Sequence, residues 1–441
     1  MNTIFLFADQ MHKYALGLVS PFVRTPNLDA LAEQGTRFDS AYSNNPVCTP
    51  FRGIILSGQL SAHCGVKGNC DPLPVHIPSM ADVFNRAGYE TAFVGKWHLG
   101  GKDNKPIPKE LRGGFKHFIG YQCYNGFYKD VCFYDEKDRE HRFEEHREEV
   151  CTRYAIDRIK KMCKTGKPFF EMVSFQAPHY PVQPPAQYAA LYAGMDIPVP
   201  PDFIDTEPYT PTFSPPSPRP FENCPDYQRY GGNMREYLRL YYAMVSHIDA
   251  CVGRIVDALE ELGIREETNI IFTADHGDMQ GSQGLKNKCL PYERSCGIPF
   301  IMSVPGAPGG LVCGTPVSAV DVYPTLLSLH GLPREKHLEG YDFSPLLRGE
   351  TVKAPPLFCE NYIPVQLSPD SPEKNTWKMV YDGNYKLTCT WEDKKPRLLY
   401  DMEKDPWEQY NLAGKGLDIE KRLAKLVMDK FGESGRRLPI I

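Results

Sequence analysis

The stretch SMADVFNRAGYETAFVGKWHLG, residues 79–100, contains the unit from which most of the chain is built. Its first half has apolar residues at helical spacing, and Gly88 follows as a stop signal. Residues 90–97 are then mostly apolar, as in a buried strand, and the polar Lys96 and His98 stand at the end of the run. The stretch therefore predicts a helix, a turn and a strand that carries polar residues at its C-terminal end.

The same alternation recurs along the chain. Further strands are predicted at residues 3–9, 168–179, 268–274 and 297–306, and further helices at residues 25–35, 241–263 and 318–332. Strands and helices that alternate with short connections predict an α/β fold, with a mostly parallel sheet sandwiched by helices.

The pattern changes at about residue 340. Residues 377–391 and 396–413 resemble short antiparallel strands, with an Asp-Gly turn inside the first segment, and residues 417–431 resemble a helix. We therefore predict a main α/β domain at residues 1–339. A smaller C-terminal α+β subdomain with a short antiparallel sheet would occupy residues 340–441.

Composition excludes several classes of function. The chain has 441 residues, a net charge of −5 and no block of Lys and Arg, so a nucleic-acid partner is not expected. No apolar run is long enough to span a membrane. The 14 cysteines show no CxxC pair, and the first ten residues lack the features of a signal peptide. These features favour free thiols and a cytoplasmic protein, with a signal peptide removed ahead of Met1 as the alternative.

Polar side chains follow the predicted strands at the point where each strand ends. Open α/β sheets bind ligands at this edge, so the side chains should meet in one site. These residues are Asp9, Lys96, His98, His179, Asp275 and His276.

Two strand ends offer metal ligands. Asp9 and Gln10 supply oxygens after the first strand, and Asp275 and His276 supply an oxygen and a nitrogen after another. Oxygen ligands suit a hard divalent cation such as Ca²⁺ or Mg²⁺. The imidazole leaves Mn²⁺ or Zn²⁺ open.

Several basic side chains accompany these ligands: Arg52, Lys96 and Lys288, with His98 and His179. The segment GKWHLG places a Lys and a His among apolar residues, and burying such groups is costly unless an anion or a metal compensates. Together the basic groups predict a pocket for a tetrahedral dianion such as sulfate or phosphate.

The segment CTPFRG, residues 48–53, puts a thiol close to a cation in a turn that leads into a helix. Cys48 beside Arg52 is either a nucleophile of low pKa or a buried structural thiol. A thiolate is poorly matched to a hard metal and a sulfate ester, and an oxygen nucleophile would suit them better.

These segments resemble a known family. CTPFRG resembles the Cys-x-Pro-x-Arg signature of the type I sulfatases, in the alkaline phosphatase superfamily, and GYETAFVGKWHLG resembles their second signature. SFQAPHYP, TADHGDMQGSQGL with the following KCLPYERSCGIPFI, and PRLLYDMEKDPWEQYNLA resemble three further family segments. The resemblance covers residues 3–413 and implies an alkaline-phosphatase-like fold and the hydrolysis of sulfate monoesters.

The resemblance also implies a modified nucleophile. In this family the signature Cys, here Cys48, is converted to formylglycine by a maturation enzyme. The aldehyde hydrates to a geminal diol, of which one oxygen attacks sulfur and releases the alcohol. The second hydroxyl then loses its proton and expels sulfate, which restores the aldehyde.

Roles for the other residues follow from the same resemblance. Arg52 and Lys96 would stabilise the formylglycine and the sulfate oxygens. His98 would take the proton that triggers sulfate release, and His179 and Lys288 would bind sulfate and assist the leaving oxygen. The implied metal ligands, with Ca²⁺ preferred and Mg²⁺ or Mn²⁺ as alternatives, are Asp9, Gln10, Cys48, Asp275 and His276. The expected substrate is a sulfated small molecule or saccharide.

Three positions depart from the common family pattern. Gln10 and His276 stand where many relatives have Asp and Asn, and the resulting set is similar to that of phosphonate monoester hydrolases and related phosphodiesterases. A phosphonate monoester or phosphodiester hydrolase is therefore the alternative activity, and a non-catalytic anion-binding protein is the alternative without chemistry. Phe51 stands at a position that is more often small and polar. Ten prolines in residues 195–229 predict a long irregular segment, either a surface loop or a lid.

Overall fold

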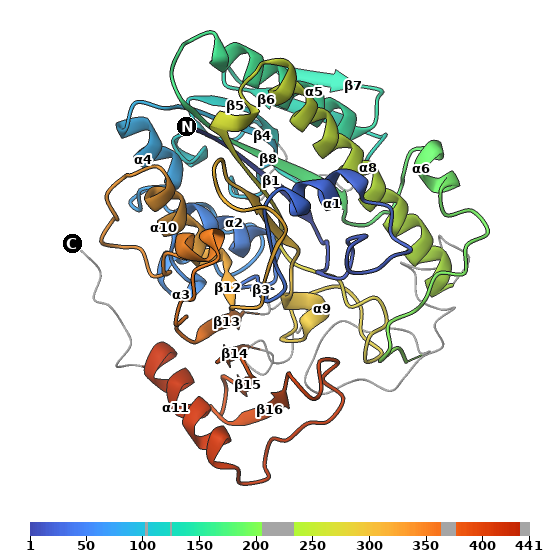
Figure 1. Cartoon of the computed structure of the whole chain (residues 1–441), viewed down its shortest axis with the longest axis vertical. Coiled ribbons are helices and arrows are strands. Elements are labelled where there is room, and N and C mark those ends of the chain that lie inside the picture. The colour runs from blue at the N-terminus through green and yellow to red at the C-terminus, as the bar shows by residue number, and fades with distance from the viewer. Residues whose placement is uncertain (102–104, 124–125, 205–232, 363–375, 433–441) are drawn as a thin grey trace.

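The computed structural model describes residues 1–101, 105–123, 126–204, 233–362 and 376–432. A ten-stranded sheet forms its centre (Figure 1). Five adjacent strands run parallel, in the spatial order β9 (Thr268–Ala274), β1 (Asn2–Asp9), β8 (Phe169–Pro178), β4 (Glu90–Lys96) and β5 (His117–Tyr121). The prediction of a mostly parallel α/β sheet is confirmed.

Mostly antiparallel pairs extend both edges of this sheet, and the outermost pair beyond β9 is parallel. Beyond β9 lie β10 (Phe300–Ser303), β2 (Thr36–Phe38) and β11 (Leu311–Cys313), and beyond β5 lie β6 (Val131–Asp135) and β7 (Glu140–Phe143). β10 runs antiparallel to β9 because residues 275–299, with the short α9 (Glu293–Cys296), turn back at the same end of the sheet instead of crossing it. A separate pair joins β3 (Ala41–Tyr42) and β12 (Val317–Ser318).

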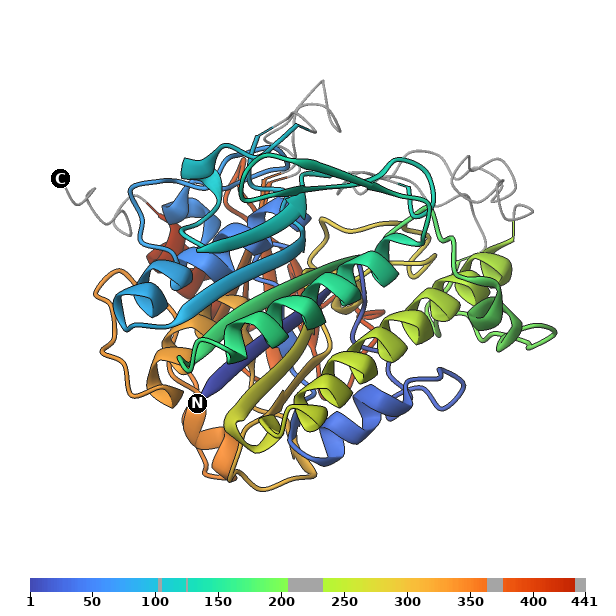
Figure 2. The ribbon, with the colours of Figure 1, turned by 90° about the horizontal axis from the view of Figure 1, so that it is seen from above.

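Helices cover both faces of the sheet (Figures 1 and 2). One face carries α1 (Pro26–Glu33), α5 (Arg147–Cys163) and α8 (Met234–Glu261), and the other carries α2 (Cys48–Ser57), α4 (Met80–Arg86) and α10 (Ala319–Leu329). Shorter helical segments are α3 (Ser61–Cys64), α6 (Ala186–Ala190), η1 (Lys109–Leu111), η3 (Arg265–Glu267) and η4 (Ser344–Arg348). The strands between these layers are buried on both faces, as their nearly continuous apolar sequences predict.

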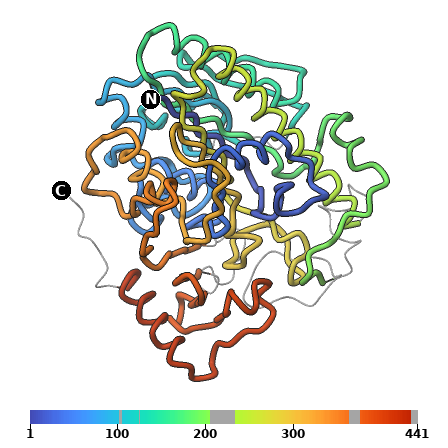
Figure 3. The backbone as a smooth tube through the Cα atoms, in the orientation of Figure 1, coloured from blue at the N-terminus to red at the C-terminus, as the bar shows by residue number. Residues whose placement is uncertain are grey.

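The C-terminal residues form a second, smaller sheet, drawn in orange to red at the bottom of Figure 3. It contains β13 (Leu357–Asn361), β14 (Trp377–Tyr381), β15 (Tyr385–Thr390) and β16 (Pro396–Asp401), all antiparallel, and α11 (Asp418–Phe431) packs on it. The predicted Asp-Gly turn joins β14 to β15, where Gly383 has a φ of 99°. The predicted antiparallel subdomain is confirmed, and the boundary at residue 339 stays a prediction.

The small sheet contacts the segment that follows β9. The Trp377 indole N–H donates to the Cys289 carbonyl at 2.8 Å, and Lys386 Nζ lies 2.8 Å from Glu293 Oε1. Because Cys289 directly follows Lys288 in the chain, its contact with Trp377 lets the C-terminal subdomain support one of the residues predicted for the site.

Other expectations differ in detail. The helix predicted at residues 241–263 begins earlier, at Met234, and α5 was not predicted. Most of the proline-rich segment lies outside the described residues. Among the described residues, no helix is both long and apolar enough to cross a membrane.

Candidate active site

Neighbouring strands bring the predicted polar residues together. Asp9 and Lys96 are the last residues of β1 and β4, His179 follows β8, and Asp275 follows β9. The four strands lie side by side in the sheet, in the order β9, β1, β8 and β4. Their C-terminal ends therefore place these side chains along one edge, where α/β sheets bind ligands.

One glycine lets β4 and β8 approach closely beside this edge. Gly95 has a φ of 109°, which side chains rarely tolerate, and a Cβ there would lie 2.1 Å from the Ser174 carbonyl oxygen. Lys96 follows directly and is buried. The glycine thus permits the strand approach that places the Lys96 ammonium group at the site.

Helix α2 supplies the thiol and the arginine. Cys48 and Arg52 are four residues apart, so they lie on the same face of the helix. Pro50 sits in the first turn, where a missing N–H leaves no hydrogen bond broken. Cys48 itself is the first residue of the helix, and the positive end of the helix dipole favours negative charge at this position.

Phe51 has a structural explanation. Its side chain is fully buried, and its ring centroid lies 6.0 Å from that of Phe7 on β1. It therefore anchors the start of α2 to the main sheet, and the packing of α2 on β1 accounts for a large apolar residue between Pro50 and Arg52.

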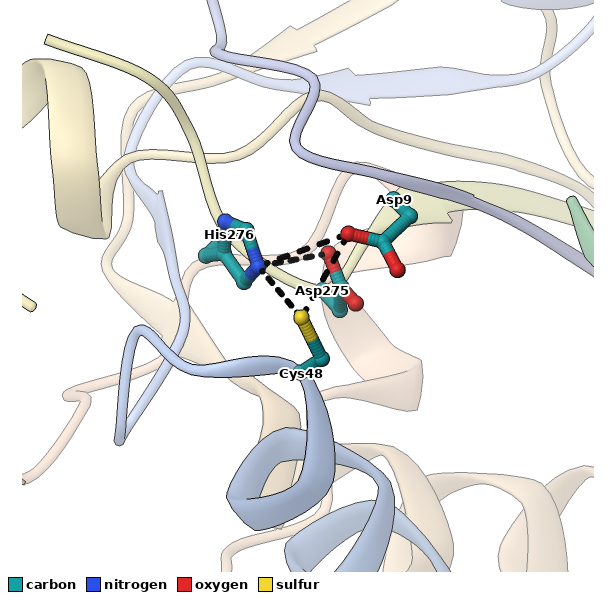
Figure 4. A group of neighbouring side chains, drawn as sticks. All are labelled: Asp9, Cys48, Asp275 and His276. Carbon is teal, nitrogen blue, oxygen red and sulfur yellow. Dashed lines mark hydrogen bonds and ion pairs between the residues drawn. The ribbon is translucent and has the colours of Figure 1, made fainter. Parts of the chain in front are cut away.

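Four side chains converge at the centre of the site: Asp9, Cys48, Asp275 and His276 (Figure 4). His276 Nε2 lies 3.5 Å from Asp9 Oδ1, 3.4 Å from Asp275 Oδ1 and 3.2 Å from the Cys48 sulfur. The Cys48 sulfur is 3.5 Å from Asp9 Oδ1. All four residues are buried, so charge on them is poorly solvated and has to be compensated locally.

Cations bind the outer oxygens of the two carboxylates. Lys96 Nζ lies 2.6 Å from Asp9 Oδ2, and Arg52 Nη2 lies 3.4 Å from Asp9 Oδ2 and 3.3 Å from Asp275 Oδ2. Arg52 also donates to the Ser174 hydroxyl at 2.6 Å and to the Lys96 carbonyl oxygen. The outer oxygens are thus held by the protein, while the Oδ1 atoms face His276 and Cys48.

Lys288 and Gln10 border the same centre. Lys288 Nζ lies 3.0 Å from the Cys48 sulfur and 3.4 Å from Gln10 Oε1. The Gln10 backbone N–H donates to Asp275 Oδ1 at 3.0 Å. Gln10 has a φ of 67°, an uncommon conformation for a residue other than glycine, which accompanies the sharp turn after β1.

The two predicted histidines are also buried here. The His179 ring interacts through Nδ1 with its neighbouring carbonyl, that of Tyr180, at 2.7 Å. His98 has a φ of 59°, and its backbone carbonyl accepts a hydrogen bond from the Thr49 hydroxyl at 3.0 Å. That bond ties the turn after β4 to the first turn of α2, which carries Cys48.

Burial and the neighbouring charges shift the pKa values of titratable groups in the site. Burial raises the pKa of Asp275, and the negative charge of Asp9 raises it further. Burial also acts to raise the pKa of the Cys48 thiol, but Lys288 and Lys96 outweigh it and lower that pKa well below the usual range. For Lys288, burial opposes the charge but Cys48 and Asp9 outweigh it, so its pKa is raised.

The donor set fits a divalent metal ion. Two carboxylate oxygens and an imidazole nitrogen lie within 4.8 Å of one another, and each belongs to a buried residue. Two buried carboxylates that face one point repel each other, and a cation between them removes that cost. Oxygen-rich sets of this kind suit Ca²⁺, Mg²⁺ or Mn²⁺.

The structure adds site residues that the sequence did not single out. Ser174 accepts a hydrogen bond from Arg52. Asp278 and Asn287 accept hydrogen bonds from the Gln10 side-chain amide. The position of Asp278, three residues after Asp275, could have drawn attention to it, but nothing in the sequence shows that its side chain contacts Gln10.

Comparisons with known proteins identify the family. The profile of the family described as "Sulfatase" matches residues 1–332, and that of "N-sulphoglucosamine sulphohydrolase, C-terminal" matches residues 281–430. The chain belongs to the sulfatase family. It is 30% identical over 424 residues to the ulvan-active sulfatase of Formosa agariphila, which covers 94% of this chain and 77% of that protein. The prediction of an enzyme of the sulfuric ester hydrolase class is confirmed.

Solved structures confirm the fold. The protein BT4656, in complex with its substrate D-glucosamine-2-N,6-O-disulfate, superposes with a TM-score of 0.81 over 98% of both chains, at 23% identity. The phosphonate monoester hydrolase SpPMH from Silicibacter pomeroyi superposes with a TM-score of 0.77, covering 100% of this sulfatase-family chain and 96% of its own, at 22% identity. The alkaline-phosphatase-like architecture is thus shared by enzymes that act on sulfur and on phosphorus esters.

Proposed function

We propose that this sulfatase-family protein hydrolyses sulfate monoesters of a saccharide, with residue 48 as the nucleophile after its conversion to formylglycine. One observation carries the proposal. The Cys48 sulfur lies close both to a buried cluster of two carboxylates and His276 and to the Lys288 ammonium group, which is 3.0 Å away. The saccharide is supported by the sulfated glucosamine that BT4656 takes as its substrate.

Residue 48 is well placed for attack on an anionic ester. It stands at the N-terminus of α2, with Lys288 Nζ 3.0 Å from its side chain. Formylglycine at this position would supply, through its hydrate, one hydroxyl that attacks sulfur and a second that later expels sulfate. The positive end of the helix and the lysine both stabilise negative charge as it develops there.

We propose Asp9, Gln10, Asp275 and His276 as the ligands of one divalent metal ion, with residue 48 as a further ligand. Ca²⁺ is preferred because most of these donors are oxygens, and Mg²⁺ or Mn²⁺ are the alternatives. When bound, the cation would draw electron density from the sulfate group and favour the ionised nucleophile.

The basic side chains divide into two groups by their contacts. Arg52 and Lys96 are held against the carboxylates, so they fix the ligands and add positive charge behind the sulfate site. Lys288, His98 and His179 are free of such carboxylate pairs in the described contacts, and we propose that they bind sulfate oxygens and transfer protons. His98 would take the proton that triggers sulfate release, and His179 and Lys288 would assist the leaving oxygen.

We also propose a maturation enzyme as a partner. Cys48 is only 1% exposed in the folded chain, so an enzyme that oxidises it has to reach it before α2 packs against the sheet. Co-expression with a formylglycine-generating enzyme should raise the converted fraction, whereas the same enzyme added to folded protein should not. Conversion of the folded protein would contradict this order of events.

The proposed activity can be tested by comparing sulfate release with the extent of modification at residue 48. Purified protein should release sulfate from an aryl sulfate in proportion to the fraction of residue 48 that mass spectrometry identifies as formylglycine. Activity that is independent of this fraction, or that survives in Cys48→Ala, would contradict the proposal. Unmodified thiol in active-site peptides of protein from its native source would support the non-catalytic alternative.

A phosphonate monoester or phosphodiester hydrolase is the second candidate. Gln10 and His276 favour it, because the set is similar to that of phosphonate monoester hydrolases, and because Gln10, in place of the Asp of many relatives, removes one negative charge from the site. The likeness in fold to SpPMH is consistent with either activity. Measuring kcat/KM on matched aryl sulfate and aryl phosphonate esters separates the two, and a large preference for the phosphorus ester would favour the second.

A further inference from the structure

The side-chain amide of Gln10 is held in one orientation by its neighbours. Its Nε2 group donates to Asp278 Oδ2 at 3.0 Å and to Asn287 Oδ1 at 3.2 Å. An amide nitrogen has two hydrogens to donate, and both find acceptors here. The Oε1 atom consequently faces the other way, where Lys288 Nζ lies 3.4 Å from it.

Asp278 is itself held by neutral donors. The Tyr237 hydroxyl donates to Asp278 Oδ2 at 2.7 Å, and the Gln280 backbone N–H donates to Oδ1 at 3.4 Å. Asp278 is 1% exposed, and among the described residues no salt bridge involves it. A buried carboxylate held only by neutral donors is costly, so a favourable interaction with positive charge nearby would offset that cost.

We propose that Asp278 is a positioning residue for the metal site, which fixes the Gln10 carbonyl oxygen toward the cation and places a negative charge directly behind an uncharged ligand. The inference rests on the metal ligands proposed above. It assigns Tyr237 and Asn287 supporting parts, because the first holds the carboxylate and the second accepts the other amide hydrogen.

A carboxylate outside the ligand set can polarise a metal ligand through a hydrogen bond. A carboxylate that accepts from the amide N–H group draws electron density toward the carbonyl oxygen, which makes that oxygen a better donor to a cation. It also excludes the flipped amide, whose NH₂ group would face both the cation and Lys288. Gln10 thus acts as a charged ligand does, with the charge displaced onto Asp278.

Calcium affinity of the protein, freed of metal by a chelator and measured by calorimetry, tests the inference without reference to turnover. Asp278→Asn should weaken Ca²⁺ binding about 10–100-fold, because its amide group can donate to Gln10 Oε1 and favour the flipped ligand. The double variant Gln10→Glu/Asp278→Asn, which swaps the amide and the carboxylate between the two positions, should largely restore Ca²⁺ affinity. An amide at residue 278 can then donate to a carboxylate at residue 10, so the hydrogen bond is kept and the charge lies on residue 10.

Asp249→Asn is the matched control. Asp249 on α8 is a buried carboxylate that likewise accepts from neutral donors, the Leu28 N–H at 2.8 Å and Asn27 Nδ2 at 2.7 Å. The Asp249→Asn protein should be less stable but should bind Ca²⁺ as tightly as the unmutated protein. Tyr237→Phe gives a milder second variant if Asp278→Asn does not fold, and it should weaken calcium binding a few-fold.

The outcomes are distinct. Folded Asp278→Asn or Tyr237→Phe protein that binds Ca²⁺ as tightly as the unmutated protein would overturn the inference and leave the metal site intact. Absence of Ca²⁺, Mg²⁺ and Mn²⁺ binding to the unmutated protein would overturn both the metal site and the inference. Weakening in Asp278→Asn without recovery in the double variant would overturn the orientation argument.

Discussion

Two clusters in the described residues combine carboxylate, imidazole and thiol side chains, and their contacts with basic side chains differ. The first contains Asp9, Cys48, Asp275 and His276. The second contains Glu149, His247 and Cys251, between α5 and α8. They offer similar atoms at similar separations, so residue type alone does not distinguish them.

In the second cluster, the acidic side chains are already paired with basic ones. Glu149 Oε1 lies 2.6 Å from His247 Nε2, and Glu149 Oε2 lies 2.6 Å from Arg254 Nη1. Arg254 also donates to the Cys251 sulfur at 3.2 Å. The carboxylate and the thiol therefore already have a basic partner, and a metal ion would have to displace it.

In the first cluster, the lysine and arginine side chains bind only one oxygen of each carboxylate. Lys96 and Arg52 bind the Oδ2 atoms of the carboxylates, while the Oδ1 atoms of Asp9 and Asp275 face His276 and Cys48. Lys96 and Arg52 therefore leave the two Oδ1 atoms facing inward, and Lys288 approaches the site from the Cys48 sulfur and Gln10 Oε1. The two clusters therefore differ in which carboxylate oxygens are left without a basic hydrogen-bond partner and could bind a metal ion.

The largest expected contrast lies between the two thiols. Cys48→Ala should lower kcat on an aryl sulfate by at least about 10³-fold, because the nucleophile is lost. Cys251→Ala, which removes a thiol of similar burial from the second cluster, should leave turnover unchanged. Equal losses in the two variants would show that the effect of Cys48→Ala is one of folding.

Metal dependence should separate the two histidines. Ca²⁺ at 100 times its Kd should stabilise the chelator-treated protein by about 2.7 kcal/mol, measured as the free energy of unfolding in denaturant. His276→Ala should lose most of this increment and the activity with it. His247→Ala should retain the calcium increment, and its loss there would mean that the second cluster binds the metal.

The second cluster should be sensitive to pH through His247. Burial alone would lower the pKa of His247, but the Cys251 thiol and the Glu149 carboxylate outweigh burial and raise it to about 9. The protonated ring therefore stabilises the fold below its unfolded pKa of about 6.5, and this contribution is lost as pH rises through about 9. Arg254 and His146 also face this group.

The measurement is the difference in unfolding free energy between the unmutated protein and His247→Gln, taken from pH 6 to pH 10. That difference should shrink by roughly 1–3 kcal/mol across the range, since other titrating groups cancel between the two proteins. A constant difference would contradict the raised pKa of His247.

The smallest effect should come from Arg254→Gln. The Arg254 side chain is 44% exposed, so its ion pair with Glu149 is screened by water, and its loss should cost at most about 1 kcal/mol of stability. Calcium affinity and kcat/KM should stay the same. A change in either would show that the second cluster is coupled to the active site and would contradict the separate roles of the two clusters.

Much of this arrangement could be predicted from the sequence. The apolar strands ending in Asp9, Lys96 and Asp275 predicted the sheet and the edge where these residues meet, because parallel strands share their C-terminal edge. The segment that contains Cys48 and Arg52 was predicted as a turn that leads into a helix; the structure instead begins α2 at Cys48, so both residues lie in the helix and on one face of it.

Other features could not be predicted. The antiparallel strands β6 and β7 depend on pairing at the edge of the sheet, which short local patterns do not specify. Asp278 lies 268 positions after Gln10, and the acceptors that orient an amide are visible only when the fold brings such segments together. The second cluster was missed because α5 was not predicted, so nothing placed Glu149 against α8.

Anomalous diffraction from crystals soaked in Mn²⁺ tests the central claim most directly. The account predicts one strong anomalous peak within bonding distance of Asp9, Asp275 and His276, next to residue 48. It predicts no peak between Glu149, His247 and Cys251. A peak only at the second cluster, or none beside Asp9 and Asp275 in crystals of active protein, would contradict it.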